Sequence, residues 1–455
     1  MESIFNITIL VIFSICTIFP LFHMINAFLL LSKKPYYMKR VRSLNEKSMS
    51  ILVPCYNEQS IIETLIFGMK NLNYQNYEYI IINDGSTDHT LSLLKRLLDL
   101  EVTVKRTTAN LEFMPVLGVY KSKKFNNVVV IDKVNGGKAD SLNAGIAYSS
   151  NELIITLDAD SILDERALPI INNVFQDHKV IAAGGIVHVL QGRKVDKESL
   201  RPTLGLKMLV RCQILEYFKG FYIYKASLAK LNALAIISGA FGVFKREVLI
   251  DVGGYRRTVG EDIDITLKVQ QYVNERKGLK VLFVPEAKCF TEVPENLLDL
   301  YKQRIRWQKA FTDCLFIYRK TLLRTLFTRP VSFFFIIEAF FTGILCGYFM
   351  VMMFLLILVL FPATAVQFLL VYIIASFTLN IIYNVLAIII ARIHNQKFYF
   401  RDFIRLGVTL LQDLLIFRYL TLFFVLSGTI QYFINKEGWN KVQRTGRQYD
   451  IEQVR

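Results

Sequence analysis

Long apolar stretches near both ends of the chain limit its possible folds more than any other feature. Residues 9–31 are predominantly apolar, and two later stretches, 335–361 and 365–391, meet at the uncharged turn 362–364. About 20 consecutive apolar residues can cross a bilayer as a helix. With 53% apolar residues and a mean hydropathy of +0.36, the chain is also more apolar than ordinary soluble domains. The sequence therefore predicts a membrane protein.

Basic residues beside these stretches predict which segments stay on the inner side of the membrane. The cations lie after the first stretch, after the last long stretch and near the end of the chain: Lys33, Lys34, Lys39, Arg40, Arg42, Arg392, Lys397, Arg401, Arg405, Lys436, Lys441, Arg444 and Arg447. A cleaved signal peptide is the alternative to an anchor at 9–31, but the start lacks cations and no small-residue cleavage site follows. We therefore expect an uncleaved anchor followed by a cytoplasmic middle region.

Residues 402–435 allow two interpretations. Gln412, Asp413 and Arg418 interrupt their apolar pattern, and charges inside a membrane usually face protein or water because they are costly in lipid. Asp413 and Arg418 either pair in a channel wall or mark a kink between an interfacial helix and a span. A cytoplasmic tail after this segment would require a hairpin within it.

The net charge of +16 does not indicate nucleic-acid binding. The chain has no basic recognition helix and no aromatic-rich ribonucleoprotein motif. Much of the excess charge lies beside the apolar stretches, where Lys and Arg attract anionic lipid head groups. The six cysteines form no CxxC pair, so neither a zinc site nor a disulfide framework is indicated. The partners favoured by this charge are membrane lipids and an anionic substrate.

Between the apolar ends, short β-branched runs alternate with helical patterns, which is typical of parallel βαβ units. We expect strands at 50–53, 79–83, 128–131 and 153–157. Polar residues follow each of them, namely Tyr56, Glu58, Asp84, Asp132, Asp158 and Asp160. Because ligands of open α/β sheets bind at the carboxyl ends of the strands, the sequence predicts a site there.

Three of the candidate motifs also have ordinary structural explanations. Asp158-Ala-Asp160 would offer two carboxylates to Mg²⁺ or Mn²⁺, although a second DxD at 262–264 reduces the specificity of the pattern. Lys138 follows a glycine pair at the start of a predicted helix, where it would neutralise a phosphate or simply face solvent. Glu261 and Asp262 open another predicted helix, which has Gly278 as its stop. They serve either as partners of the helix dipole or, in the case of Asp262, as a general base.

The segment 303–307 places three functional side-chain types on one predicted helix face. Gln303, Arg306 and Trp307 have i, i+3 and i+4 spacing. An aromatic ring can stack on a sugar, and an arginine can bind a diphosphate through two hydrogen bonds. The alternative is a tryptophan that anchors an interfacial helix at the membrane surface.

Taken in order, these residues resemble the D, DxD, ED and QxxRW series of membrane-bound family 2 glycosyltransferases, which include cellulose, hyaluronan, chitin and poly-N-acetylglucosamine synthases. The matching residues are Asp84, Asp158-Ala-Asp160, Gly260-Glu-Asp262 and Gln303-Arg-Ile-Arg306-Trp307. The resemblance covers residues 48–325, and 238–246 is similar to bacterial exopolysaccharide synthases. It implies an α/β GT-A-type nucleotide-sugar-binding domain with a mostly parallel sheet, beside an α-helical transmembrane bundle. The long stretch 107–124 departs from the pattern and would fit a family-specific hairpin.

The resemblance also implies an activity. The implied enzyme is a metal-dependent, inverting, processive hexosyltransferase at the cell membrane, which polymerises a UDP-sugar into a β-linked exopolysaccharide. The donor that the resemblance favours is UDP-N-acetylhexosamine. The polymer would leave through the membrane helices, with Asp413 and Arg418 as polar lining. Because no cyclic-dinucleotide domain follows the last span, regulation of the cellulose-synthase kind would need an accessory subunit.

The roles that the resemblance implies are carried over by position. The residues expected to bind nucleoside, diphosphate and glycan are Tyr56, Glu58, Asp84, Lys138, Asp158, Glu261, Gln303, Arg306 and Trp307. Asp160 would ligate Mg²⁺ or Mn²⁺. Asp262 would be the catalytic base.

These expectations divide the chain into five parts: an anchor at 1–32, a cytoplasmic catalytic domain at 33–309, an interfacial amphipathic helix at 310–330, membrane helices at 331–435 and a basic tail at 436–455. Two alternatives to a polymerase remain. One is a single-transfer enzyme that glycosylates a lipid phosphate carrier, although such enzymes usually lack QxxRW. The other is a non-catalytic membrane subunit that binds nucleotide.

Overall fold

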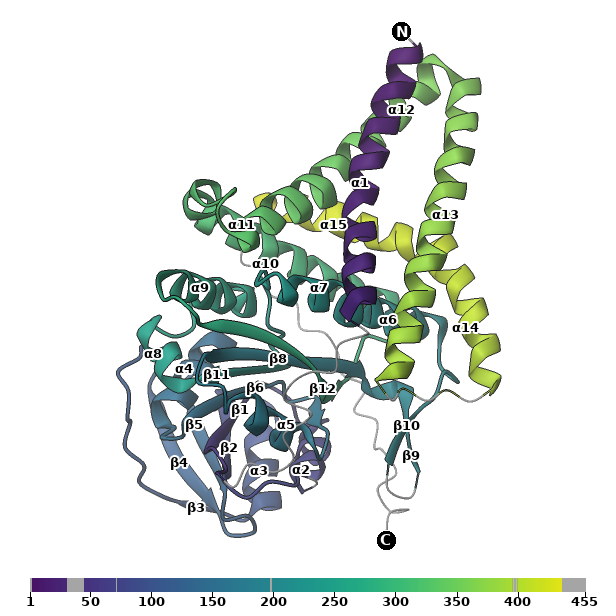
Figure 1. Ribbon diagram of the computed structural model, residues 1–455. Helices are drawn as coiled ribbons and strands as arrows, with labels where there is room; N and C mark the ends of the chain where they lie inside the picture. Colours follow the sequence, from purple (N-terminus) through teal and green to yellow (C-terminus); the bar gives the residue numbers. More distant parts are fainter. Residues whose placement is uncertain are drawn as a thin grey trace. The chain divides into compact units, whose positions relative to one another are not determined.

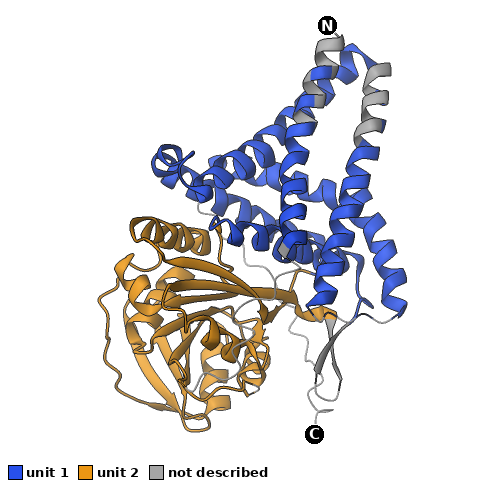
Figure 2. Cartoon of the chain, viewed as in Figure 1, with its two compact units in different colours: residues 1–33, 201–233, 295–442 blue, residues 34–200, 234–294, 443–455 orange. Residues whose placement is uncertain are grey.

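The computed structural model describes residues 2–30, 45–70, 72–196, 199–394, 396, 398 and 400–435. The chain forms two compact units (Figure 2). Unit 1 contains residues 1–33, 201–233 and 295–442, and unit 2 contains residues 34–200, 234–294 and 443–455. The predicted cation clusters at 33–42 and 436–447, and Lys397, lie outside the described residues.

Unit 2 is built on a ten-stranded sheet with the order β3-β4-β5-β2-β1-β6-β11-β8-β12-β7 (Figure 1). The four strands expected from β-branched runs lie together in it and are all parallel: β5 (Val128–Lys133), β2 (Tyr77–Asp84), β1 (Met49–Cys55) and β6 (Leu153–Leu157). Their side chains are nearly all buried, as expected for β-branched residues that pack on both faces of a covered sheet. These four predictions are confirmed.

The remaining strands make the sheet mixed rather than mostly parallel. β4 runs antiparallel to both β3 and β5, and β11 runs antiparallel to both β6 and β8. The stretch 107–124 contains β4, which forms a hairpin with β5 because the short connection between them permits only antiparallel pairing. The bounds of these strands are β3 Leu100–Val102, β4 Val116–Ser122, β7 Ser161–Leu163, β8 Val180–Val189, β11 Phe241–Lys245 and β12 Lys280–Thr291.

The helices of unit 2 follow the strands and bring two of the predicted motifs to the sheet. α4 begins at Lys138 and packs against β1 and β2, and α9 begins at Glu261 and ends three residues before Gly278. Both helix starts are at the predicted residues. The bounds are α2 Ile62–Lys70, α3 Thr90–Leu98, α4 Lys138–Tyr148, α5 Ala167–Val174, α8 Arg246–Asp251 and α9 Glu261–Glu275, with a short turn at Leu190–Gly192. A separate two-stranded ribbon pairs β9 (Arg193–Asp196) with β10 (Ser199–Pro202).

Unit 1 is helical, and α1, α12 and α13 contact one another (Figure 1). Its helices are α1 Glu2–Leu30, α6 Met208–Phe218, α7 Ala226–Lys230, α10 Leu297–Arg324, α11 Pro330–Phe333, α12 Cys346–Leu360, α13 Pro362–Ile393, α14 Phe400–Gln412 and α15 Arg418–Ile434. Three π-helical segments join them: η3 Lys219–Lys225, η4 Phe334–Leu345 and η5 Asp413–Phe417. Within the described residues, the segments 330–360, 373–393 and 400–434 are long and apolar enough to cross a membrane, and Ser14–Leu29 is a shorter apolar helix.

The segment 400–434 is one continuous helical run that bends at its π-helical part (Figure 1). It does not fold back as a hairpin. Asp413 Oδ2 accepts hydrogen bonds from Lys219 Nζ at 3.0 Å and from the amide nitrogens of Asn380 and Asn384 at 3.0 and 3.2 Å. Arg418 donates to the carbonyl oxygen of Ser376 at 3.3 Å. Asp413 therefore pairs with Lys219 rather than Arg418, so of the two interpretations of this segment the Asp413–Arg418 pair is not formed.

Candidate active site

Tyr56 and Glu58 lie in the loop after β1, and Asp84 is the last residue of the neighbouring strand β2, directly before its loop. Because β1 and β2 pair in parallel, both loops leave the sheet at the same edge. Asn57 N donates to Ser86 Oγ at 3.0 Å and ties one loop to the other. Tyr56 is 39% exposed, whereas Asp84 is buried. The structure thus brings these three predicted residues to one edge of the sheet.

Asp84 fixes the loop that precedes α4. Its Oδ1 accepts hydrogen bonds from Lys133 Nζ at 2.7 Å and Gly136 N at 3.0 Å, and its Oδ2 accepts one from Gly137 N at 2.8 Å. Hydrogen bonds to an ionised carboxylate are roughly twice as strong as neutral ones. Asp84 therefore holds the backbone immediately before Lys138.

Asp158 and Asp160 directly follow β6, as predicted. Asp160 is 3% exposed, and its Oδ1 accepts hydrogen bonds from the hydroxyls of Ser161 and Thr291, both at 3.1 Å. The Asp158 side chain is 31% exposed. Asp158 is thus the more accessible carboxylate of the pair, and Asp160 is the more buried one.

The Lys138 ammonium lies between two carboxylates from different parts of unit 2. Its Nζ is 2.6 Å from Asp158 Oδ1 and 2.9 Å from Glu261 Oε1. Burial alone would lower the Lys138 pKa, but the negative charges of Asp158, Glu261 and Asp262 outweigh this effect, and the pKa is raised above its ordinary value. Lys138 is therefore a cation at neutral pH that links the end of β6 to the start of α9.

Glu261 and Asp262 occupy the first turn of α9. The N-terminal end of a helix dipole stabilises negative charge at this position. Asp264, which completes the second DxD, is completely buried and pairs with Arg256 at 2.7 Å and with Lys268 at 3.6 Å. Asp264, the last residue of the second DxD, therefore forms structural ion pairs, whereas Asp262, its first residue, is partly exposed.

Asn143 and Tyr255 also help to build this site, although neither was predicted from the sequence. Tyr255 N donates to Asn143 Oδ1 at 2.8 Å, and Asn143 Nδ2 donates to the Tyr255 carbonyl oxygen at 2.9 Å. Burial raises the Tyr255 pKa, and the charges of Glu261 and Asp262 add to this effect, whereas Lys138 opposes it. Asn143 lies in the motif that carries Lys138, but the sequence of that motif does not indicate a contact between Asn143 and Tyr255.

Gln303, Arg306 and Trp307 lie in unit 1 on α10, which runs without a break from Leu297 to Arg324. Gln303 is buried, Arg306 is partly exposed, and Trp307 is 41% exposed. The arginine over the Trp307 ring is Arg304, whose guanidinium carbon lies 4.2 Å from the ring centre. Arg304 also pairs with Glu216 of α6 at 2.6 Å. Neither Arg304 nor Glu216 was predicted from the sequence as a site residue.

The acidic pair fits a metal that is shared with substrate. No group of three or more His, Cys, Asp or Glu that could hold a metal occurs within the described parts of the chain. Mg²⁺ and similar hard ions are usually held by one or two carboxylates together with substrate phosphates and water. Asp158 and Asp160 offer such oxygen ligands, so the pair fits an ion that takes its remaining ligands from outside the protein.

Two family models match consecutive parts of the chain. The model described as glycosyl transferase family 2 matches residues 50–114, and the model described as glycosyltransferase like family 2 matches residues 117–310. Together they cover every site residue described above. The chain belongs to the family 2 glycosyltransferases.

This glycosyltransferase is similar to curated relatives from staphylococci. It is 31% identical over 293 residues to the poly-β-1,6-N-acetyl-D-glucosamine synthase of Staphylococcus aureus strain COL, a match that covers 62% of this chain and 61% of the relative. The synthase of the same name from Staphylococcus epidermidis is 30% identical over 272 residues, which covers 59% and 56% of the two chains. The glycosyltransferase thus spans about three fifths of the length of these relatives.

A solved structure confirms the fold class. The mannosyltransferase PcManGT from Pyrobaculum calidifontis, in complex with GDP-Man and Mn²⁺, matches the glycosyltransferase with a TM-score of 0.52 at 14% identity. The match covers 94% of this chain and 100% of that chain. The predicted GT-A-type α/β domain with apolar helices is therefore correct, although its sheet is mixed.

Proposed function

We propose that this glycosyltransferase is a processive, inverting enzyme that polymerises UDP-N-acetylglucosamine into a β-linked exopolysaccharide. The observation that carries this proposal is the position of Lys138 between Asp158 and Glu261, because it joins the acidic pair, a cation for phosphate and the neighbouring Asp262 in one cluster. The similarity to two poly-β-1,6-N-acetyl-D-glucosamine synthases supports the choice of sugar.

The loops at the ends of β1 and β2 would bind the nucleoside. Tyr56 offers a partly exposed ring for stacking on the base, while Glu58 and Asp84 lie on the same edge of the sheet. Lys138 would bind the diphosphate, because an ammonium at the start of α4 combines its own charge with the positive end of the helix dipole.

Asp160, with Asp158 beside it, would hold Mg²⁺ or Mn²⁺. The chemistry that such an ion supplies when bound is neutralisation of the charge on the leaving diphosphate. Asp158 contributes the more exposed carboxylate, and Asp160 the one held by two hydroxyls.

Asp262 would act as the general base of a single displacement. The acceptor hydroxyl oxygen forms a bond to the anomeric carbon, the bond from that carbon to the diphosphate oxygen breaks, and the hydroxyl proton passes to Asp262. UDP leaves with the bonding electron pair, and one displacement inverts the anomeric configuration. Glu261 would bind the donor beside the base.

Gln303, Arg306 and Trp307 would bind the diphosphate and the acceptor end of the glycan. The Trp307 ring is covered on one side by Arg304 and is 41% exposed, which leaves area for a sugar to stack. Arg306 is partly exposed, so its guanidinium can reach an anionic ligand.

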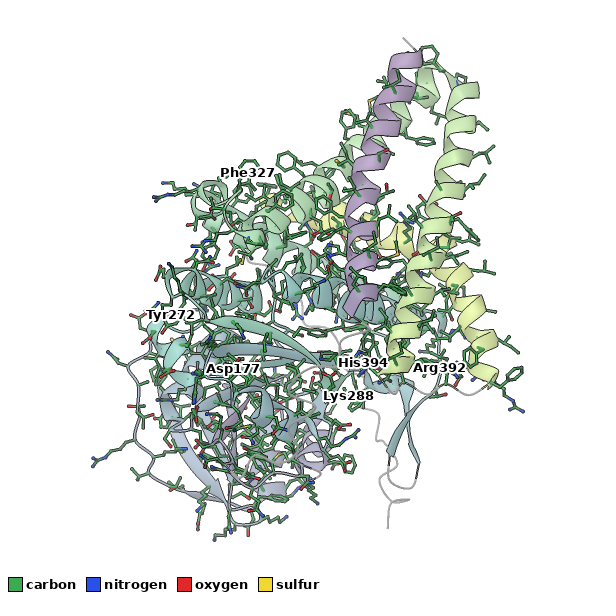
Figure 3. All side chains as sticks on the ribbon, viewed as in Figure 1. Asp177, Tyr272, Lys288, Phe327, Arg392 and His394 are labelled. Atoms are coloured by element: carbon green, nitrogen blue, oxygen red, sulfur yellow. The ribbon has the colours of Figure 1, made fainter. Side chains whose placement is uncertain are left out.

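The apolar helices of unit 1 would hold the enzyme in the cell membrane as a multi-pass protein with unit 2 in the cytoplasm, and would pass the polymer outward. Phe327 is 86% exposed in the loop after α10, between Arg324 and Arg329 (Figure 3). An exposed aromatic residue flanked by cations is typical of a membrane interface. Membrane lipids would be partners here, and accessory exopolysaccharide subunits would supply regulation.

The test supplies membrane vesicles that contain the full chain with single UDP-sugars in the presence of Mg²⁺ or Mn²⁺. UDP-N-acetylglucosamine should give UDP release and a high-mass polymer. Asp262→Asn should abolish both, whereas Glu275→Gln, an exposed carboxylate on the same helix, should leave both unchanged. UDP release that survives in Asp262→Asn would disprove the assignment of the base.

Product size separates the proposal from its alternatives. A low-mass, lipid-linked sugar would identify a single-transfer enzyme that acts on a lipid phosphate carrier. Nucleotide binding without UDP release from any donor would identify a non-catalytic subunit.

A further inference from the structure

The Lys138 ammonium occupies a place that a divalent cation would also seek. It lies within ion-pair distance of both Asp158 and Glu261, so one positive charge is shared between two carboxylates. We propose that Lys138 and the divalent metal compete for Asp158, so that metal binding requires the Lys138–Asp158 ion pair to open. The inference rests on the proposed function, which supplies the metal and the diphosphate.

The competition centres on Asp158 because the other carboxylate of the pair is less available. Asp160 is buried, and one of its oxygens accepts two hydroxyl hydrogen bonds. A metal that approaches the accessible Asp158 oxygens meets the Lys138 charge at close range, and like charges at a few ångströms repel strongly in a partly buried site. Metal alone should therefore bind weakly.

A nucleoside diphosphate would relieve this repulsion. Once its phosphates enter the site, Lys138 gains an anionic partner other than Asp158, and Asp158 becomes available to the metal. Nucleotide and metal should then each increase the affinity of the other, because coupling between two binding events is reciprocal. Lys138 would act as an internal counter-ion that favours loading of metal and donor together.

The local structure allows Lys138 to move while its backbone stays in place. Its side chain is 24% exposed, and a Cβ on Gly239 would lie only 2.8 Å from the Lys138 Nζ, so a glycine there leaves space for the ammonium. The loop before Lys138 is held separately, through the hydrogen bonds from Gly136 and Gly137 to Asp84. Exchange of the ammonium between carboxylate and phosphate would then occur by rotation of the side chain, with the backbone held in place.

The test measures Mn²⁺ binding to the purified full chain in detergent, without nucleotide, from the electron paramagnetic resonance signal of free Mn²⁺. Lys138→Met should bind Mn²⁺ about tenfold more tightly than the wild type, because a neutral side chain of similar length replaces the competing cation. Addition of UDP should tighten Mn²⁺ binding in the wild type and have a smaller effect in Lys138→Met. Lys268→Met removes a lysine beside Asp264 and should leave the Mn²⁺ affinity unchanged.

Two further variants locate the competition. In an Asp158→Asn background, Lys138→Met should no longer tighten Mn²⁺ binding, and Lys138→Arg, which keeps the charge, should bind Mn²⁺ as weakly as the wild type. Equal or weaker Mn²⁺ binding by a folded Lys138→Met, a gain that persists in the Asp158→Asn background, or no Mn²⁺ binding in either protein would each overturn the inference. Failure of every UDP-sugar to turn over would instead overturn the proposed function, because these binding measurements need no turnover.

Discussion

The guanidinium of Arg304 lies 4.2 Å from the centre of the Trp307 ring, and the same guanidinium is held by Glu216 at 2.6 Å. Arg304 and Trp307 are three positions apart on α10, so helix geometry places them on one face. Because Arg304 is fixed by a carboxylate of α6, the orientation of Trp307 depends on packing between two helices as well as on its own rotamer. One side of the ring is thereby occupied before any ligand arrives.

Arg304→Lys should therefore loosen Trp307 and lower polymer synthesis roughly tenfold, because lysine lacks the planar fork that pairs and stacks at the same time. The emission of Trp307 should also shift to longer wavelength, which can be measured in a Trp439→Phe background because the chain has 2 tryptophans. Arg319→Lys, an exposed position on the same helix, is the matched control and should alter neither readout. Unchanged emission and activity in Arg304→Lys would remove the basis for this role.

Asn143→Asp tests whether the contact with Tyr255 positions the start of α9. Aspartate keeps the acceptor for Tyr255 N but loses the donor to the Tyr255 carbonyl oxygen, and it adds a buried charge. We expect a loss of about 1–3 kcal/mol of stability and a fall in kcat that exceeds any rise in KM. Thermal unfolding and UDP-release kinetics measure the two effects. The exposed Asn73→Asp should behave as the wild type in both assays.

Two glycines of unit 1 should respond to alanine with opposite signs. A Cβ on Gly428 of α15 would lie 2.6 Å from the Cβ of Gln308 on α10, so Gly428→Ala would push the helices apart and cost about 1–3 kcal/mol. A Cβ on Gly407 of α14 would meet nothing within 4 Å, so Gly407→Ala should stabilise the protein by roughly 0.5–1 kcal/mol through helix propensity. Unfolding temperatures in detergent test both. A stabilised Gly428→Ala would contradict the close contact of α10 with α15.

Local patterns were sufficient to predict the centre of unit 2. The runs at β1, β2, β5 and β6 are β-branched and end in polar residues, and a parallel strand buried on both faces produces this pattern whatever surrounds it. The starts of α4 and α9 were predicted from a glycine pair and an acidic first turn. The prediction of a mostly parallel sheet was wrong beyond the centre, because strand direction at β4 and β11 is set by connections and partners that periodicity does not encode.

The contacts that the sequence did not predict join residues far apart in the chain. Asn143 meets Tyr255, Arg304 meets Glu216, and Asp413 meets Lys219, and in none of these pairs did the sequence pattern indicate the partner. The family resemblance directed attention to Arg306, whereas the side chain that covers Trp307 is Arg304. Such pairs depend on tertiary packing, and a single sequence gives no measure of it.

The ion pair between Lys219 and Asp413 provides a test of buried charge in unit 1. The Asp413 side chain is 3% exposed and the Lys219 side chain 18% exposed, with Nζ and Oδ2 3.0 Å apart. Lys219→Met should cost about 3–5 kcal/mol because it leaves the carboxylate buried with only the amides of Asn380 and Asn384. Adding Asp413→Asn to Lys219→Met should recover much of the loss, since a neutral amide of the same shape removes the uncompensated charge. Lys225→Met, in the same π-helical segment, is the control and should have little effect. If the single and double variants unfold at the same temperature in detergent, the pair contributes no net electrostatic stabilisation.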